Sequence, residues 1–321
     1  MTRNQESILI DQSSTERSKD SDMRAVVFRN IGGPEVLEII EAPVPEPGAG
    51  QVRIKVAAAT VNAADVSIRA GKLAIEGITD RGQLGLGWDV AGTVDALGAG
   101  VSGPAKGTAV IGMVSGFFEV GAQADYAVVD AEGVAVAPDS VDLVHAATIP
   151  VNAQTADQAL ALVAARPGDR ILIAGAAGGV GGYAVQLARH AGLHVVAHAR
   201  PGDAALLREL GAHEAVSDLD GLRVDAAFDA APLGDAAIST VRDGGTYVTS
   251  RADLMPEAQR GIRLEEPDTK NDGARLAQLV KLVDEGVLTT RVAKTYPLTE
   301  VAKAHADFAR GGVRGRLVLI P

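Results

Sequence analysis

A glycine-rich stretch between an apolar run and an amphipathic run is the part of this sequence best suited to bind a phosphate. Residues 173–189 read IAGAAGGVGGYAVQLAR. Gly178 and Gly179 lack a Cβ, so a diphosphate can approach the main chain, and Gly181 lets a helix pack closely on the preceding strand. A plain strand-to-helix turn is the alternative, but the strand and helix around the motif favour a dinucleotide site at the helix N-terminus. The predicted dinucleotide contacts here are Gly175, Ala177, Gly178, Gly179, Val180 and Gly181.

The end of the next strand-like segment indicates which dinucleotide is bound. That segment ends in His198, Ala199 and Arg200, without the acid that usually holds the ribose hydroxyls of NAD. Arg200 is a suitable partner for a 2′-phosphate, and His198 is a second candidate contact. NADPH is therefore favoured over NADH. A solvated loop cation is the alternative for Arg200, and the nearby Asp203 weakens the assignment.

The sequence offers little for binding a metal. It contains no cysteine, so disulfides and thiolate metal sites are excluded. The histidines show no ligand spacing supported by partner ligands, and we interpret them as surface or packing residues: His145, His190, His194, His198, His213 and His305. No metal site is predicted.

Two different sequence patterns along the chain indicate the secondary-structure elements that position these residues. From Met23 to about Pro138 short strands are broken by Gly, Pro and Asp, which predicts a barrel-like β domain. Helical spacing then appears over 145–165, and strand-like and helix-like segments alternate, which is typical of a parallel sheet covered on both faces. We expect strands over 24–28, 51–58, 90–97, 109–111, 171–175, 194–199, 224–230, 245–250 and 314–320, and helices over 180–191, 203–211 and 275–286.

Length and charge set further limits. The 321 residues are 47 % hydrophobic, enough for two domains, and no apolar run approaches the roughly 20 residues of a membrane span. A net charge of −11 without a dense Lys/Arg block argues against nucleic acid or an anionic membrane as the main partner. Residues 1–22 lack the pattern of a secretion signal and are predicted to be a disordered extension, so we expect a cytoplasmic protein.

Several stretches, in order, resemble the zinc-independent medium-chain dehydrogenases/reductases of the quinone oxidoreductase (zeta-crystallin-like) branch. They are MRAVVFRNIGGPEVLEI, VAAATVNAADVSIRAGK, LGWDVAGTVDALGAGV, AATIPVNAQTADQAL, GAAGGVGGYAVQLAR and RGRLVLIP. The resemblance implies an α/β fold with a GroES-like catalytic domain over 23–146, a Rossmann NADP(H)-binding domain over 147–266, and a return to the first domain over 267–321. It also implies NADPH as coenzyme and a homodimer as the expected assembly.

The resemblance also suggests site residues. It places Asn62 and Asp65 near the nicotinamide or the substrate, as catalytic candidates, and Thr155 near the nicotinamide carboxamide. An amide donor such as Asn62 is suited to hold a carbonyl oxygen in a site without metal. The alternatives are that Asn62 and Asp65 cap a helix, and that Thr155 is a buried helix hydroxyl.

The chain departs from its relatives at a few positions. Asp89, in GWDVAG, stands where zinc relatives carry the Glu of GHE, so catalytic zinc is not expected. Leu73 replaces an aromatic residue and Asn152 a small or apolar one, so both are predicted to line the substrate site. Asp203 stands where some relatives place a Lys for the 2′-phosphate, which Arg200 would have to replace.

These features predict an NADPH-dependent reductase that transfers a hydride to a quinone or an α,β-unsaturated carbonyl without a metal. One alternative is a dedicated enoyl or ketone reductase of a biosynthetic intermediate, for example a polyketide. Another, of a different class, is a non-catalytic protein that binds or senses NADPH.

Overall fold

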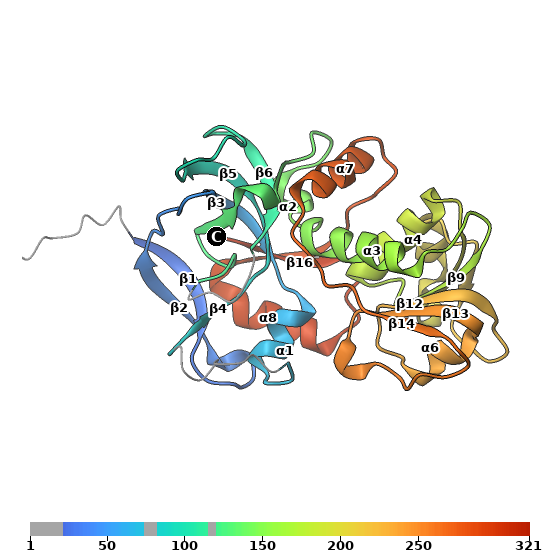
Figure 1. The fold of residues 1–321 in the computed structure, drawn as a ribbon. Helices are drawn as coiled ribbons and strands as arrows, with labels where there is room; N and C mark the ends of the chain where they lie inside the picture. Colours follow the sequence, from blue (N-terminus) through green and yellow to red (C-terminus); the bar gives the residue numbers. More distant parts are fainter. Residues whose placement is uncertain (1–21, 74–81, 115–119) are drawn as a thin grey trace, which may run out of the picture.

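The computed structural model describes residues 22–73, 82–114 and 120–321, which form two lobes joined through a central helix (Figure 1). The extension expected over 1–22 lies outside the described residues, except for Asp22. Within the part of the chain that is described, no helix is both long and apolar enough to cross a bilayer.

The first lobe is a β domain, as predicted, and its strands pair antiparallel except for β15 (Val292–Pro297) and β16 (Arg316–Ile320) of the returning chain, which pair in parallel. A three-stranded sheet has the order β2-β1-β4, and a seven-stranded sheet has the order β15-β16-β3-β5-β6-β8, with β7 paired to β3. The N-terminal strands are β1 (Asp22–Phe28), β2 (Leu37–Pro43), β3 (Gln51–Thr60), β4 (Leu84–Gly85), β5 (Asp89–Leu97), β6 (Ala109–Met113), β7 (Tyr126–Asp130) and β8 (Val134–Val136). A short helix, α1 (Ala63–Arg69), follows β3 directly.

The second lobe is a parallel sheet of six strands in the order β11-β10-β9-β12-β13-β14. Its strands are β9 (Arg170–Ala174), β10 (His194–His198), β11 (Glu214–Val216), β12 (Val224–Asp229), β13 (Val241–Thr249) and β14 (Arg263–Glu265). Chain order reverses between β9 and β12, and the carboxyl ends of strands at such a point form the crevice in which dinucleotides bind. The predicted combination of a GroES-like domain with a Rossmann domain is confirmed.

The helices of the second lobe differ from the sequence expectation in two places, one of which is α6 (Asp235–Thr240), a helix that was not expected. The segment 145–165 is not one helix: α2 (Leu143–Ala146) ends before α3 (Pro150–Val163) begins. Pro150 occupies the first turn of α3, where a missing N–H costs no helical hydrogen bond. The other helices are α4 (Gly179–His190), α5 (Ala204–Glu209) and α6 (Asp235–Thr240), and the 3₁₀ turns are η2 (Pro34–Val36), η4 (Ala131–Gly133), η5 (Pro201–Asp203), η6 (Ala252–Leu254) and η7 (Leu298–Glu300).

After the parallel sheet the chain returns to the first lobe. It forms α7 (Gly273–Asp284), β15 (Val292–Pro297), α8 (Val301–Arg310) and β16 (Arg316–Ile320). β16 pairs antiparallel with β3, so that Val318 lies opposite Thr60. This register brings the last strand beside the end of β3, where the chain enters α1.

The main apolar cluster is continuous between the two lobes. It contains Ala58 and Ile111 from the first lobe, Ala153 of α3, and Ile173 and Phe228 from the parallel sheet. α3 therefore packs on both lobes (Figure 1). Burial of this shared apolar surface holds the crevice edge of the parallel sheet next to the first lobe.

Helix α8 contains a buried histidine that has no hydrogen-bond partner on either ring nitrogen. His305 is 0 % exposed, and burial together with the nearby Arg69 guanidinium lowers its pKa to about 3. The ring is therefore neutral in the folded protein at neutral pH.

We expect this histidine to make stability depend on pH. In the unfolded chain the imidazole has a pKa near 6.5. Below that pH the unfolded state binds a proton at this ring and the folded state does not. Above about pH 6.5 the buried neutral ring has no effect on the pH dependence of the free energy of unfolding. As the pH falls from there toward 3, the free energy of unfolding decreases by up to about 1.4 kcal/mol per pH unit. Denaturant unfolding at several pH values should show a flatter profile for His305→Leu than for the wild type. His190→Gln, at an exposed position, is the control, and an unchanged profile for His305→Leu would contradict the assignment.

Candidate functional site

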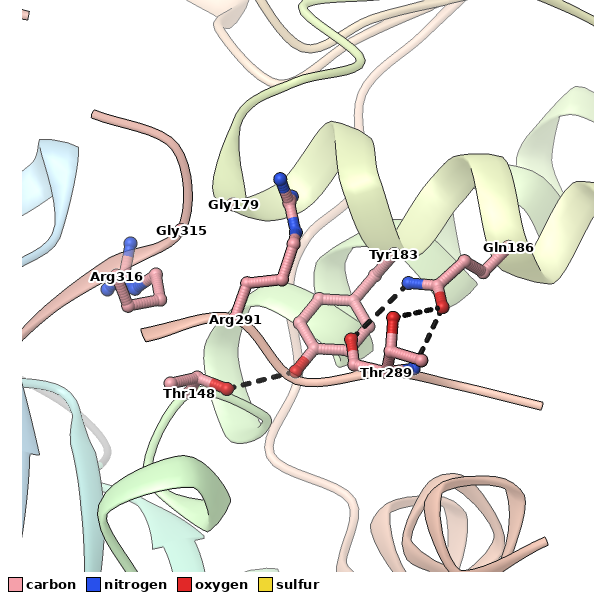
Figure 2. Close-up of a pocket in the computed structure, with 8 residues that line it drawn as sticks. All are labelled: Thr148, Gly179, Tyr183, Gln186, Thr289, Arg291, Gly315 and Arg316. Carbon is pink, nitrogen blue, oxygen red and sulfur yellow. Dashed lines mark hydrogen bonds between the residues drawn. The ribbon is translucent and has the colours of Figure 1, made fainter. Parts of the chain in front are cut away.

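A pocket lies between the first turn of α4 and the segment that returns to the first lobe (Figure 2). Its wall combines the glycine-rich turn with basic and hydroxyl side chains. The lining residues are Thr148, Gly179, Tyr183, Gln186, Thr289, Arg291, Gly315 and Arg316. One of these residues, Gly179, lies shortly after Ala174, the carboxyl end of β9, where the order of the parallel sheet reverses.

The glycine-rich turn has the close approaches predicted for it. Gly175 has φ +71°, in the left-handed region that favours glycine, and its carbonyl accepts the N–H of Gly178 at 2.9 Å. A Cβ on Gly181 would overlap the Gly175 carbonyl oxygen, so the helix starts directly against the strand end. The N–H groups at the start of α4 have no intrahelical acceptor, as at any helix N-terminus, and are suited to bind an anion.

Arg316 joins this turn to the first lobe. One terminal nitrogen, Nη2, donates to Thr60 Oγ1 at 2.7 Å and to Asn62 Oδ1 at 2.6 Å. The other, Nη1, lies 3.4 Å from the position that a Cβ on Gly179 would take. The side chain is nearly fully buried, burial lowers its pKa, and its Nε has no partner. A buried guanidinium with an unsatisfied N–H beside a helix N-terminus fits a phosphate group.

Asp89 is the centre of the polar cluster on the other side of Arg316. Its carboxylate is 0 % exposed and accepts hydrogen bonds from the Thr60 hydroxyl, from Asn62 Nδ2 at 2.8 Å and from the Val151 amide at 2.7 Å. Val151 belongs to the first turn of α3, so the carboxylate also occupies that helix N-terminus. The residue that stands in the place of a zinc relative's glutamate is therefore engaged by protein donors.

Asn62 and Asp65 form the helix cap that the spacing suggests. Asp65 is fully buried and accepts the backbone N–H of Asn62 at 2.7 Å and that of Gly87 at 2.9 Å. Burial raises the pKa of Asp65 to about 7, against the opposing effect of these two hydrogen bonds. The Asn62 amide is held at both ends, by Arg316 on Oδ1 and by Asp89 on Nδ2. Its second contact from Nδ2, to Thr60 at 3.3 Å, is long.

The other predicted site residues lie around this cluster at different depths. Thr155 donates to the Val151 carbonyl at 2.7 Å and meets Thr269 at 3.0 Å. Asn152 lies under the glycine turn, since its Oδ1 is 2.9 Å from the Cβ position of Gly179. Leu73 packs on the apolar cluster around Phe28, Ile68, Leu84 and Leu86. Whether Thr155, Asn152 and Leu73 contact coenzyme or substrate stays a prediction.

The residues at the end of β10 are arranged around a second ion pair. Asp203 is bound by both the Nε and the Nη2 of Arg314, the latter at 2.7 Å, so its charge is compensated. Arg200 is exposed, and its terminal nitrogens lie 3.8–3.9 Å from the Cβ positions of Gly311 and Gly312. His198 is half-buried with an unpartnered Nδ1, and burial lowers its pKa.

The sequence did not single out Arg316 or Arg291, although both line the pocket. Arg316 lies within RGRLVLIP, which carried part of the resemblance, but nothing local marks it as a site residue. Only the pairing of β16 with β3 brings it to Thr60 and Asn62.

Comparison with known proteins agrees with this architecture. Residues 48–139 match the family model described as an alcohol dehydrogenase GroES-like domain, and residues 208–319 match one described as a zinc-binding dehydrogenase. The chain is 30 % identical over 326 residues to the NADPH-dependent alkenal/one oxidoreductase of Arabidopsis thaliana chloroplasts, with 96 % of this chain and 82 % of that protein covered.

Solved structures show the same relationship. The quinone oxidoreductase from Coxiella burnetii superposes with a TM-score of 0.86 at 29 % identity, covering 94 % of this chain and 99 % of the other. A mycobacterial protein solved in complex with NADPH superposes with a TM-score of 0.82 at 27 % identity, covering 93 % and 100 % of the two chains. The chain belongs to the medium-chain dehydrogenase/reductase superfamily. It is an oxidoreductase, and NADPH is the coenzyme of the Arabidopsis relative and the ligand in the mycobacterial structure.

The glycine turn provides a direct test of coenzyme binding. Gly181→Ala should weaken NADPH binding by about tenfold or more, because the new methyl displaces the turn from the strand end. Titration of NADPH fluorescence measures this. Gly103→Ala is the matched control, since a Cβ there meets only Val101, at 3.8 Å. Equal affinities of the Gly181→Ala variant and the wild type would mean that the coenzyme does not bind at this turn.

Proposed function

We propose that the protein is an NADPH-dependent reductase that transfers a hydride to a quinone or to an α,β-unsaturated carbonyl without a metal ion. The observation that carries the proposal is the position of Arg316, between the glycine turn and the Asp89–Asn62–Thr60 cluster. A coenzyme diphosphate at the turn and a substrate beside α1 would then be held through one buried guanidinium.

The chemistry of the polar cluster supports a reaction without metal. The Asp89 carboxylate already accepts from Thr60, Asn62 and the Val151 amide, and Arg316 supplies the compensating positive charge, with Nη2 at 3.4 Å. Across residues 22–73, 82–114 and 120–321, no three His, Cys, Asp or Glu side chains gather as metal ligands. We assign carbonyl polarisation to hydrogen-bond donors.

The roles of the residues follow from these contacts. When bound, the coenzyme supplies the hydride, and the acceptor takes up one proton in addition. Asp65 and Arg316 orient Asn62, whose second Nδ2 hydrogen makes only the long contact to Thr60. We assign that hydrogen to the carbonyl oxygen of the substrate, where it stabilises the negative charge that develops as the hydride arrives.

Arg200 is the proposed ligand of the 2′-phosphate. It stands at the carboxyl end of β10, where the ribose of a dinucleotide lies in this fold. The nearby Asp203, which on sequence grounds opposed this role, is neutralised by Arg314. An exposed guanidinium beside two glycines leaves room for a phosphate.

The substitution Arg200→Ala should therefore affect the binding of NADPH and NADH differently. We expect about a tenfold or larger loss of NADPH affinity and little change for NADH, because only NADPH carries the 2′-phosphate. Fluorescence titration with both nucleotides gives the ratio of the NADPH and NADH affinities. Arg208→Ala removes an exposed arginine from the neighbouring α5 and should leave this ratio unchanged. Equal losses for NADPH and NADH would refute the role of Arg200.

The reaction itself is tested by absorbance at 340 nm with ortho-quinones, para-quinones and enones as acceptors. We expect NADPH oxidation with simple acceptors and a loss of about 10- to 1000-fold in kcat for Asn62→Ala. NADPH binding without turnover of any simple acceptor would favour a dedicated reductase of a larger biosynthetic enone. Turnover that Asn62→Ala leaves intact would remove Asn62 from the mechanism.

A further inference from the structure

A short piece of the returning chain lies along one face of α4. Gly178, Gly182 and Gln186 are spaced four residues apart and so share that face. At its far end, Gln186 Oε1 accepts the Thr289 amide at 2.8 Å and the Thr289 hydroxyl at 2.9 Å. The chain from Thr289 to Arg291 then runs toward the glycine turn (Figure 2).

Arg291 is the last residue of this segment, residues 289–291, which we call the strap, and its side chain contacts the glycine turn. Its Nη1 donates to the Ala177 carbonyl at 3.1 Å and its Nη2 to the Gly178 carbonyl at 2.6 Å. The guanidinium also fills the space beside Gly182, where a Cβ would overlap Nη2. The forked donor geometry of arginine matches two neighbouring carbonyls in a way that the ammonium of lysine does not.

We propose that Arg291 is a positioning residue for the coenzyme diphosphate. By binding the two carbonyls of the glycine turn, Arg291 fixes the turn so that the amides of the following helical turn face the phosphates. The proposal rests on the proposed function, because it takes the glycine turn as the diphosphate site. The two carbonyls belong to the residues just before α4, and the Gly178 carbonyl also accepts the N–H of Gly182 at 3.1 Å. Fixing them therefore fixes the start of the helix.

The same strap connects the turn to the polar cluster of the first lobe. The carbonyl of Arg291 accepts the backbone N–H of Arg316 at 2.8 Å, and the side chain of Arg316 holds Asn62. The two guanidinium groups line one pocket together with Gly179 (Figure 2). Both guanidinium groups are partly desolvated, so their positive charge favours a diphosphate at the adjacent turn, and no acidic residue lines the pocket.

The first test is nucleotide binding to Arg291→Ala, measured by fluorescence titration for NADPH and NADH and by calorimetry for adenosine 2′-monophosphate. We expect NADPH and NADH to weaken alike, by about 10- to 100-fold, because both carry the diphosphate. Adenosine 2′-monophosphate, which lacks the diphosphate, should bind within about twofold of the wild type. Arg291→Lys, which keeps the charge but not the fork, should recover part of the loss.

Two controls separate this effect from a general loss of structure. Arg310→Ala removes an exposed arginine from the same returning segment and should bind all three nucleotides normally. Retained affinity of Arg291→Ala for adenosine 2′-monophosphate shows that the Rossmann lobe is folded.

A double-mutant cycle with Gly182 tests the contact directly. Gly182→Ala alone should weaken NADPH because its methyl group displaces the guanidinium. In the Arg291→Ala background the same substitution should have little effect, since the space is already free. Additive losses would overturn the proposal, as would wild-type NADPH affinity in Arg291→Ala. Failure of the wild-type protein itself to bind NADPH would instead refute the coenzyme site and with it the proposed function.

Discussion

The pairing of β16 with β3 is the constraint on which the site depends. It places Arg316, near the end of the chain, against Thr60 and Asn62 at the end of the third strand. A buried guanidinium without its partners would be costly, and losing one partner of a buried ion pair typically costs about 3–5 kcal/mol. The cluster around Asp89 therefore holds the returning strand, α1 and α3 in one arrangement.

In this arrangement both lobes contribute residues to the crevice that we propose for the coenzyme. The parallel sheet contributes the glycine turn at the carboxyl end of β9, and the returning chain contributes Arg291 and Arg316. Arg314 adds a third contact across the same boundary, by its ion pair with Asp203. Arg291 and Arg314 donate to acceptors on the parallel-sheet lobe, and Arg316 donates within the first lobe while its side chain packs beside Gly179, so charge-assisted hydrogen bonds set the geometry of the crevice together with the shared apolar core.

Local patterns predicted much of the fold. The alternation of strands and helices placed β9, α4 and β10 within one or two residues, because apolar periodicity and turn residues are local properties. The helix expected over 145–165 was wrong in its start, since Pro150 begins a new helix after α2. The amphipathic helix α8 was not predicted, although its buried face includes Val301, Ala304 and His305.

The sequence by itself determined the class of fold, the glycine turn and the helix cap formed by Asn62 and Asp65, because each depends on residues a few positions apart. Tertiary structure alone decided which charged and polar groups contact each other. Asp89 lies 227 positions from Arg316 along the chain, and Ala177 lies 114 positions from Arg291. No local periodicity encodes such contacts, since they arise only when β16 joins the sheet of β3 and the strap lies on α4.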